Sequence, residues 1–324
     1  MLTVVILALI ALTALIGAFL LARHRVRLIE ARHPPSAEFI NVAGIRLHYR
    51  RTGNSAQPAI LVLHGATSNL EEPFAALSER LEGEHVIWLD RPGLGWSDRP
   101  EGPWSPEREA ALIADFLDEI GVSSALVVGH SWGGAIAMRL AMDHPARVDA
   151  LLLIAPALSA WIGEAAWFNK VSFWPGAGWL LTHVIVPIVG EKQTAAGARS
   201  AFHPEPVPAD YVSRTSLPLL LRPRTWRANA ADMKCVNEHL EVQETRYQDI
   251  EHHTLVLAGK GDTVLWSHRH GGQVAARMPN GEMRWIGGAG HNLHHHHPEA
   301  VHDAILALRE RAAGSSGLAV QNAE

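Results

Sequence analysis

The chain has a single cysteine, Cys235, among its 324 residues. One thiol excludes an internal disulfide framework and any zinc or iron–sulfur site built from cysteines. Only 19% of the residues are charged, and Asp plus Glu outnumber Lys plus Arg by 33 to 28. The protein therefore lacks the excess of positive charge that nucleic-acid binding requires, and we expect no nucleic-acid partner.

Charge is also absent from residues 1–22, where 13 positions are Leu, Ile, Val or Phe. At roughly −0.3 to −0.6 kcal/mol for each such residue, this composition favours insertion into a membrane by about 5 kcal/mol. The run is long enough to span a bilayer as a helix. A cleaved signal peptide is the alternative, but the positive segment and the small-x-small site that it requires are not found here. We therefore predict a transmembrane anchor over residues 1–22.

Basic residues follow the predicted anchor, and none precedes it: Arg23, Arg25, Arg27 and Arg32. The positive-inside rule then places the remainder of the chain in the cytoplasm. We expect residues 23–37 to form a linker, and the protein to be a single-pass membrane protein whose main domain lies in the cytoplasm.

Apolar runs after the linker indicate strands that alternate with helices. Residues 38–49 predict an antiparallel hairpin that turns at Ala43-Gly44. Ser105 and Gly121 mark the two ends of a predicted helix. Five uninterrupted apolar runs are typical of parallel strands with both faces covered: residues 59–63, 86–89, 125–128, 151–154 and 254–258. Strands that alternate with helices in this way predict an α/β fold with a mostly parallel sheet.

The alternation stops after Pro156 and resumes at Thr254, and the stretch between them is rich in Trp and Pro. We interpret this stretch as a cap inserted into the core. The predicted divisions are the first part of the core (38–156), a helical cap (157–250), the second part of the core (251–312) and a flexible tail (313–324).

The most informative motif is Gly129-His130-Ser131-Trp132-Gly133, which follows an apolar strand and precedes a helical pattern. A serine held on a sharp turn from strand to helix projects its hydroxyl outward. Its neighbours two residues away must lack bulk, and Gly129 and Gly133 meet that need. The same turn aims the N–H of Trp132 toward an oxygen beside Ser131. Ser131 is therefore the candidate nucleophile.

A serine hydroxyl needs a base, and the base needs an acid to orient it. His291 follows a short strand-like run in a glycine-rich loop, and Asp262 follows the strand at 254–258 in another. Both loops would reach the carboxyl edge of the sheet. The chain order Ser131, Asp262, His291 is that of a known triad arrangement. After the strand at 59–63, the N–H of Ala66 is the second candidate oxyanion donor.

These residues resemble the α/β-hydrolase superfamily over about residues 38–311. The resemblance depends on His64-Gly65 after the third strand, the run from Asp90 to Ser97 after the fourth, the turn at Ser131, and then Asp262 and His291. It implies a mostly parallel eight-stranded sheet with a helical cap, preceded here by the transmembrane helix. It also implies the roles already assigned to Ser131, Asp262, His291, Ala66 and Trp132.

The nucleophile position favours serine chemistry, because the epoxide hydrolases and haloalkane dehalogenases of the superfamily carry Asp there. We expect a serine hydrolase that cleaves an apolar carboxylic ester or lipid through an acyl-enzyme, with no cofactor. The alternatives are a cofactor-free haloperoxidase or carbon–carbon bond hydrolase with the same triad, and a ligand-binding member without catalysis. Aromatic residues of the cap would suit an apolar substrate: Trp161, Trp167, Phe168, Phe173, Trp174, Trp179 and Trp226.

The chain also contains 20 His residues, four of them in the run His294–His297. No spacing among them matches a helical pair of histidine ligands with an acid. We therefore assign no metal site from the sequence and expect only adventitious binding of nickel or zinc.

Overall fold

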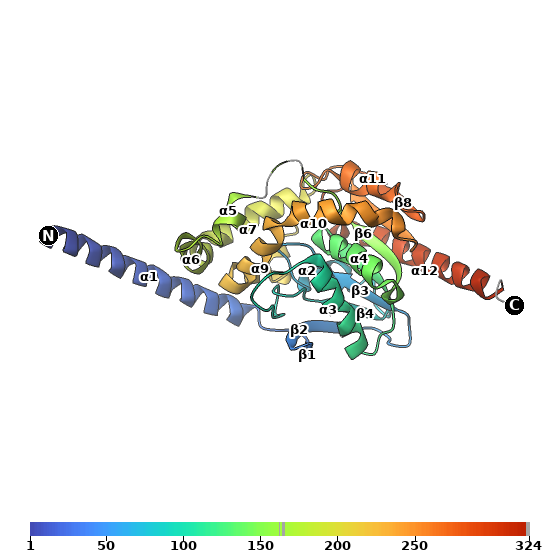
Figure 1. Cartoon of the computed structure of the whole chain (residues 1–324), viewed down its shortest axis with the longest axis horizontal. Helices are drawn as coiled ribbons and strands as arrows, with labels where there is room; N and C mark the ends of the chain where they lie inside the picture. Colours follow the sequence, from blue (N-terminus) through green and yellow to red (C-terminus); the bar gives the residue numbers. More distant parts are fainter. Residues whose placement is uncertain (162, 164–165, 322–324) are drawn as a thin grey trace.

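An eight-stranded sheet forms the centre of the protein. The computed structural model describes residues 1–161, 163 and 166–321, and the sheet lies between layers of helices (Figure 1). The strand order is β1-β2-β4-β3-β5-β6-β7-β8. Strand β2 pairs antiparallel with both of its neighbours, β1 and β4, and all the other pairs are parallel. This confirms the fold class expected from the sequence. The strands are β1 (Glu38–Val42), β2 (Ile45–Thr52), β3 (Ala59–Leu63), β4 (Val86–Leu89), β5 (Ala125–His130), β6 (Val148–Ile154), β7 (Thr254–Gly259) and β8 (Gly281–Ile286).

The central strands are apolar because helices cover both faces of the sheet. Every residue of β3, β4 and β5 is buried, as expected for strands in the middle of a parallel sheet. Helices α3, α4 and α11 contribute to the core on one face, and α2 and α12 on the other. Their bounds are α2 (Glu71–Leu77), α3 (Pro106–Glu119), α4 (Trp132–Asp143), α11 (Gln273–Ala275) and α12 (Pro298–Gln321).

A helical cap is inserted between β6 and β7. Several hydrogen bonds join it to loops at the carboxyl end of the sheet. Among them, the Thr67 N–H donates to Asn229 Oδ1 (2.7 Å), and the His291 N–H donates to the Ala201 carbonyl (2.9 Å). The cap therefore covers the edge at which the candidate catalytic residues lie. Its helices are α5 (Trp167–Val171), α6 (Ala177–Leu180), the π-helical turn η2 (Leu181–Ile185), α7 (Val186–Phe202), α8 (Tyr211–Arg214), α9 (Pro223–Lys234) and α10 (Val236–Gln243).

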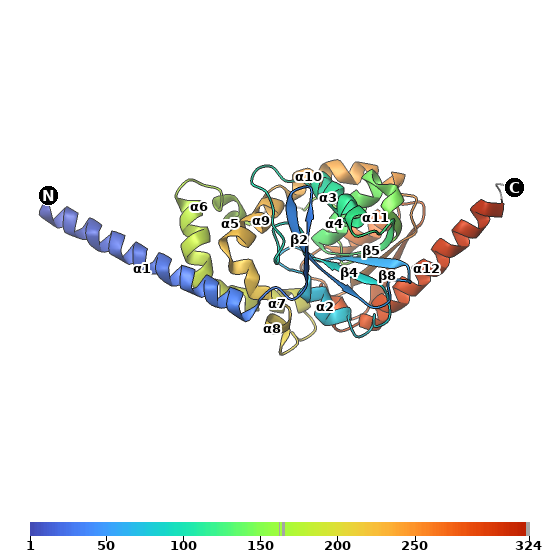
Figure 2. The same ribbon diagram turned by 90° about the horizontal axis from the view of Figure 1, so that it is seen from below.

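The N-terminal helix α1 (Leu2–Arg32) runs without a break and projects from the domain (Figures 1 and 2). Its most apolar 18-residue window has a mean hydropathy of 3.0 and no buried residue, so its length and composition allow it to cross a membrane. The helix continues through residues 23–32, which the sequence indicated as a linker. Ala22 and Ile29 are buried, and Ile29 packs against the cap. These contacts hold the end of α1 on the domain, which explains why the expected linker is helical.

The C-terminal helix α12 extends away from the sheet on the side opposite to α1 (Figure 2). Residues 313–321 continue this helix, although the sequence indicated a flexible tail from 313 onward; residues 322–324 lie outside the described residues. Gly314 and Gly317 each cost only about 1 kcal/mol in a helix relative to alanine. Two such residues weaken a helix without ending it.

Candidate active site

Ser131 lies on a sharp turn between β5 and α4. Its φ of 51° and ψ of −118° are unusual for a residue with a side chain, and such strain persists only where the surroundings impose it. Here the Ser131 N–H donates to the Ile154 carbonyl (3.0 Å), and the Ser131 carbonyl accepts from the N–H groups of Gly134 and Ala157 (2.9 and 3.0 Å). Backbone bonds to three separate positions thus hold the turn in place.

The two glycines of the motif are required by close backbone contacts. A Cβ placed on Gly129 would lie 2.7 Å from the Gly133 carbonyl oxygen, and one placed on Gly133 would lie 2.3 Å from the Leu63 carbonyl oxygen. Neither backbone oxygen can move without displacing its strand or helix. The structure therefore gives a steric reason for glycine at both positions.

His291 and Asp262 are in direct contact, although they come from different loops. His291 Nδ1 lies 2.9 Å from Asp262 Oδ2, and both side chains are almost fully buried. Asp262 Oδ1 also accepts from the N–H groups of Val264 and Leu265 (2.8 and 3.0 Å). Burial opposes ionisation of Asp262, but the hydrogen bond from His291 and these two backbone bonds outweigh it and lower the pKa of the carboxyl. Asp262 is thus an anionic partner for Nδ1 of His291.

His291 also lies beside the turn that carries Ser131. The ring centroids of His130 and His291 are 5.0 Å apart, and His130 immediately precedes the serine. Among the residues that the structure describes, the Ser131 hydroxyl makes no hydrogen bond. Catalytic hydrogen bonds are often long without substrate and shorten when it binds. The structure therefore brings Asp262 and His291 together and places the pair next to Ser131.

The loop after β3 forms the other wall of this site. A Cβ placed on Gly65 would lie 3.1 Å from the Ser131 Cβ, so the backbone at 65–66 runs next to the serine. Trp132 is the first residue of α4, where N–H groups have no partner within the helix. The positions of Ala66 and Trp132 are thus compatible with two N–H donors directed at one oxygen.

His64 joins two loops below the site. Its Nε2 accepts from the Arg91 N–H (3.0 Å), so its Nδ1 carries the proton and donates to the Gly65 carbonyl (2.9 Å). Burial and the nearby Arg91 guanidinium lower the pKa of His64 to about 4. The residue is therefore a neutral structural histidine at pH 7.

A second buried cluster lies behind the site, and it contains a residue that the sequence analysis missed. Glu72 of α2 accepts through Oε1 from Nε2 of His294 (2.9 Å) and from Nε2 of His295 (2.8 Å). The Glu72 carboxylate is 2% exposed. Burial alone would raise its pKa, but the two imidazoles outweigh that effect and hold the pKa well below 4.5. His294 and His295 are thus buried partners of a carboxylate, whereas the sequence pattern indicated only a run available for adventitious metals.

This cluster could hold a metal ion, because the three ligand atoms of Glu72, His294 and His295 lie within 4.8 Å of one another. The two hydrogen bonds to Glu72 also account for the arrangement without an ion. No local pattern could have found the cluster, since Glu72 and His294 are 222 positions apart. The ring of His130 lies between this cluster and the site, with centroids 4.6 Å from His294 and 5.0 Å from His291. Burial lowers the pKa of His130 well below 6.5, so this ring is neutral.

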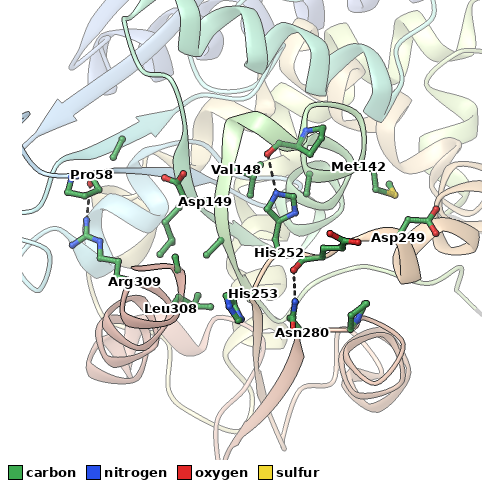
Figure 3. A pocket seen from close by; sticks show the side chains of 18 of the residues that line it. Pro58, Met142, Val148, Asp149, Asp249, His252, His253, Asn280, Leu308 and Arg309 are labelled. Atoms are coloured by element: carbon green, nitrogen blue, oxygen red, sulfur yellow. Dashed lines mark hydrogen bonds between the residues drawn. The ribbon is translucent and has the colours of Figure 1, made fainter. Parts of the chain in front are cut away.

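A cavity of about 1190 Å³ lies at the opposite edge of the sheet, near the amino ends of β3, β5 and β6 (Figure 3). Its polar side chains join loops to one another. His252 Nε2 bonds to the Pro145 carbonyl (3.1 Å), Asn280 donates to the Glu251 carbonyl (2.6 Å), and Arg309 donates to the Pro58 carbonyl (2.9 Å). None of the predicted catalytic residues lines this cavity, so we place the site at the carboxyl edge.

The fold, with its mostly parallel eight-stranded sheet, is that of an α/β hydrolase. The model of the alpha/beta hydrolase family matches residues 60–304. The chain belongs to this family.

Two curated relatives share local similarity with the chain. One is the dihydrolipoyllysine-residue acetyltransferase component of the acetoin cleaving system of Cupriavidus necator, 37% identical over 119 residues, which cover 37% of this chain and 32% of the relative. The other is lipase LipV of Mycobacterium tuberculosis, 36% identical over 115 residues, which cover 36% of this chain and 43% of the relative. The matched region is therefore less than half the length of either relative.

Among solved structures, the chain resembles a bacterial membrane phospholipase A with a TM-score of 0.62 and 22% identity. The match covers 96% of this chain and 97% of the other. At this level of identity, the likeness concerns the fold alone. It extends over nearly the whole of both chains.

Proposed function

We propose that the protein is a membrane-anchored serine hydrolase that cleaves an apolar carboxylic ester or lipid. The observation that carries this proposal is the bond between Asp262 and Nδ1 of His291, beside the strained turn of Ser131. With Nδ1 engaged, the Nε2 atom of His291 is the one available to accept a proton from the serine hydroxyl.

In the proposed reaction, Ser131 Oγ attacks the substrate carbonyl while His291 Nε2 takes the hydroxyl proton. The oxyanion that forms accepts hydrogen bonds from the N–H groups of Ala66 and Trp132. His291 then gives its proton to the departing alcohol, and the acyl group stays on Ser131 as an ester. A water molecule, deprotonated by His291, attacks this ester and releases the carboxylic acid. Asp262 stabilises the positive charge that His291 carries in both steps.

The substrate class is proposed from the relatives and from α1. One relative is named a lipase, and a similar fold is that of a membrane phospholipase A. An apolar helix of membrane-spanning length would hold the enzyme at a lipid surface. The orientation remains the one expected from the arginines after α1, with the hydrolase domain in the cytoplasm.

A fluorophosphonate probe tests the nucleophile, because it forms a covalent bond only with an activated serine. We expect labelling of the wild-type protein and no labelling of Ser131→Ala. Ser213→Ala is the matched control, since Ser213 is exposed on the cap and should label like the wild type. Equal labelling of Ser131→Ala and the control would contradict the mechanism.

A panel of esters with increasing acyl length tests the substrate class. We expect turnover to favour the longer, apolar acyl chains. The carbon–carbon hydrolase and haloperoxidase alternatives predict instead cleavage of a vinylogous diketone, or bromination with peracid, without ester turnover. A ligand-binding protein without catalysis would be stabilised by a ligand but would turn over none of the panel.

A further inference from the structure

The cap carries an apolar surface that faces solvent. Three of its tryptophans are exposed by 68% (Trp167), 60% (Trp174) and 43% (Trp179). These rings were expected to face an apolar substrate, but at such exposures they do not line an enclosed pocket. Three aliphatic side chains in the same stretch are also exposed. We call the six residues the apolar cap surface: Trp167, Trp174, Trp179, Leu180, Ile185 and Val189.

This surface adjoins the apolar part of α1. The ring centroids of Phe19 and Trp179 are 5.4 Å apart. Six residues further along α1, Arg25 Nη1 donates to the Ile188 carbonyl at the start of α7 (2.9 Å). Ile29 is buried against Leu181 and Val186. The views in Figures 1 and 2 agree that α5 and α6 lie on the side of the domain from which α1 projects.

The contact between Phe19 and Trp179 sets the depth of the surface relative to a membrane. Phe19 lies inside the uncharged run of α1, and Arg23 is the first charged residue after it. Four residues of helix span about 6 Å, so Phe19 lies about 6 Å from the level at which the charges begin, and Trp179 lies beside Phe19. Tryptophan is enriched at this level, where its apolar ring and its N–H group meet the boundary between lipid and water.

We propose that the apolar cap surface is inserted into the interfacial layer of the same bilayer that α1 enters. The partner is the phospholipid surface itself. Arg23, Arg25 and Arg27 lie at the boundary beside it and would attract anionic head groups. This contact goes beyond the proposed hydrolase activity, because it requires no chemistry at Ser131.

The contact would also connect the membrane to the candidate active site through α7. Val189, in the first turn of α7, belongs to the apolar cap surface, and the carbonyl of Ala201, near the other end, accepts the N–H groups of His291 and Asn292 (2.9 and 3.0 Å). These two positions are 12 residues apart, which corresponds to about 18 Å of helix. One helix would therefore run from the bilayer surface to the loop that holds the candidate base.

Spin labels on the full-length protein in phospholipid vesicles test the proposal. Because Cys235 is the only cysteine, Cys235→Ser provides a background in which Trp174→Cys or Trp167→Cys gives one labelled site. Trp266→Cys is the matched control, since Trp266 is 67% exposed and lies on the loop between β7 and α11, and α11 lies on the side of the domain away from α1 (Figure 1). Vesicles of phosphatidylcholine with phosphatidylglycerol supply the bilayer, and collision with oxygen or with a water-soluble chromium complex reports depth.

For each label, we compare the rate of collision with oxygen to the rate of collision with the chromium complex. We expect this ratio to be several-fold higher for labels at positions 174 and 167 than for the label at position 266. Equal collision ratios at the three positions would overturn the proposal. A label at Leu12→Cys reports on α1 separately, so a failed anchor and a solvated cap are distinguishable. Fluorophosphonate labelling of the same variants tests Ser131 independently. Circular dichroism of each variant confirms that the labelled protein is folded, and either cap position alone decides the outcome.

Discussion

Replacing Glu72 with glutamine tests the buried cluster behind the candidate active site. The carboxylate accepts two hydrogen bonds from His294 and His295 at Oε1. Hydrogen bonds to a charged group contribute about 1.5–3 kcal/mol each, against about 0.5–1.5 kcal/mol for neutral pairs. Glutamine keeps the shape and the oxygen but removes the charge. We therefore expect Glu72→Gln to lower the free energy of unfolding by about 2–3 kcal/mol at pH 7.

The effect should depend on pH in a defined direction. The pKa of Glu72 in the folded protein is below its unfolded value of 4.5. A carboxyl with a lowered folded pKa stabilises the protein fully above the unfolded pKa, and this stabilisation is lost as the pH falls through the folded pKa. The difference in stability between the wild type and Glu72→Gln should therefore be full at pH 7 and should shrink below about pH 4.5.

Thermal unfolding in a mild detergent, followed by circular dichroism, measures the difference. For a domain of this size, 2–3 kcal/mol corresponds to a decrease in Tm of roughly 4–12 °C. Glu79→Gln is the control, because Glu79 is exposed just beyond the end of α2 and surface changes usually stay within about 0.5 kcal/mol. Equal Tm values for the two variants at pH 7 would refute the reasoning. A chelator should leave the Tm of the wild type unchanged. If the chelator lowered the Tm of the wild type but not that of Glu72→Gln, the cluster would hold a metal ion instead.

Three further predictions concern the triad, pH and the anchor. Asp262→Asn should lower kcat about 10⁴-fold in an ester assay, as loss of the orienting acid does in serine triads, and an unchanged kcat would exclude this role. Folding lowers the pKa of His64 to about 4, so the unfolded protein binds more protons than the folded protein between pH 6.5 and 4. The free energy of unfolding should therefore fall by about 3 kcal/mol from pH 6.5 to 4. In denaturant titrations, His64→Gln should make this pH dependence smaller. Deletion of residues 1–21 should remove the need for detergent with little change in Tm. Deletion of residues 1–32 should lower Tm, because it also removes the contacts of Arg25 and Ile29 with the cap. Equal Tm values for the two truncated proteins would contradict these contacts.

The sequence determined the features that depend on local geometry. Glycine is needed on both sides of Ser131. A Cβ on Gly129 would clash with the backbone of Gly133 in the same turn, and a Cβ on Gly133 would clash with the backbone of Leu63 in the adjacent strand β3. The apolar runs of β3, β4 and β5 predicted strands covered on both faces, since such strands have no polar side to show. The pairing of Asp262 with His291 followed from chain order and the family resemblance, and the structure places their side chains 2.9 Å apart.

Other features were decided only by packing between distant parts of the chain. The sequence could not associate Glu72 with His294 and His295, because contacts across more than 200 residues leave no periodic pattern. Nor could composition tell whether the tryptophans of the cap face inward or outward, since an aromatic ring suits either a pocket or a membrane surface. The extension of α1 to Arg32 likewise depends on the cap, which buries Ile29. Local sequence constrains backbone geometry and strand burial, whereas the partners of a buried charge or an exposed ring exist only once the chain has folded.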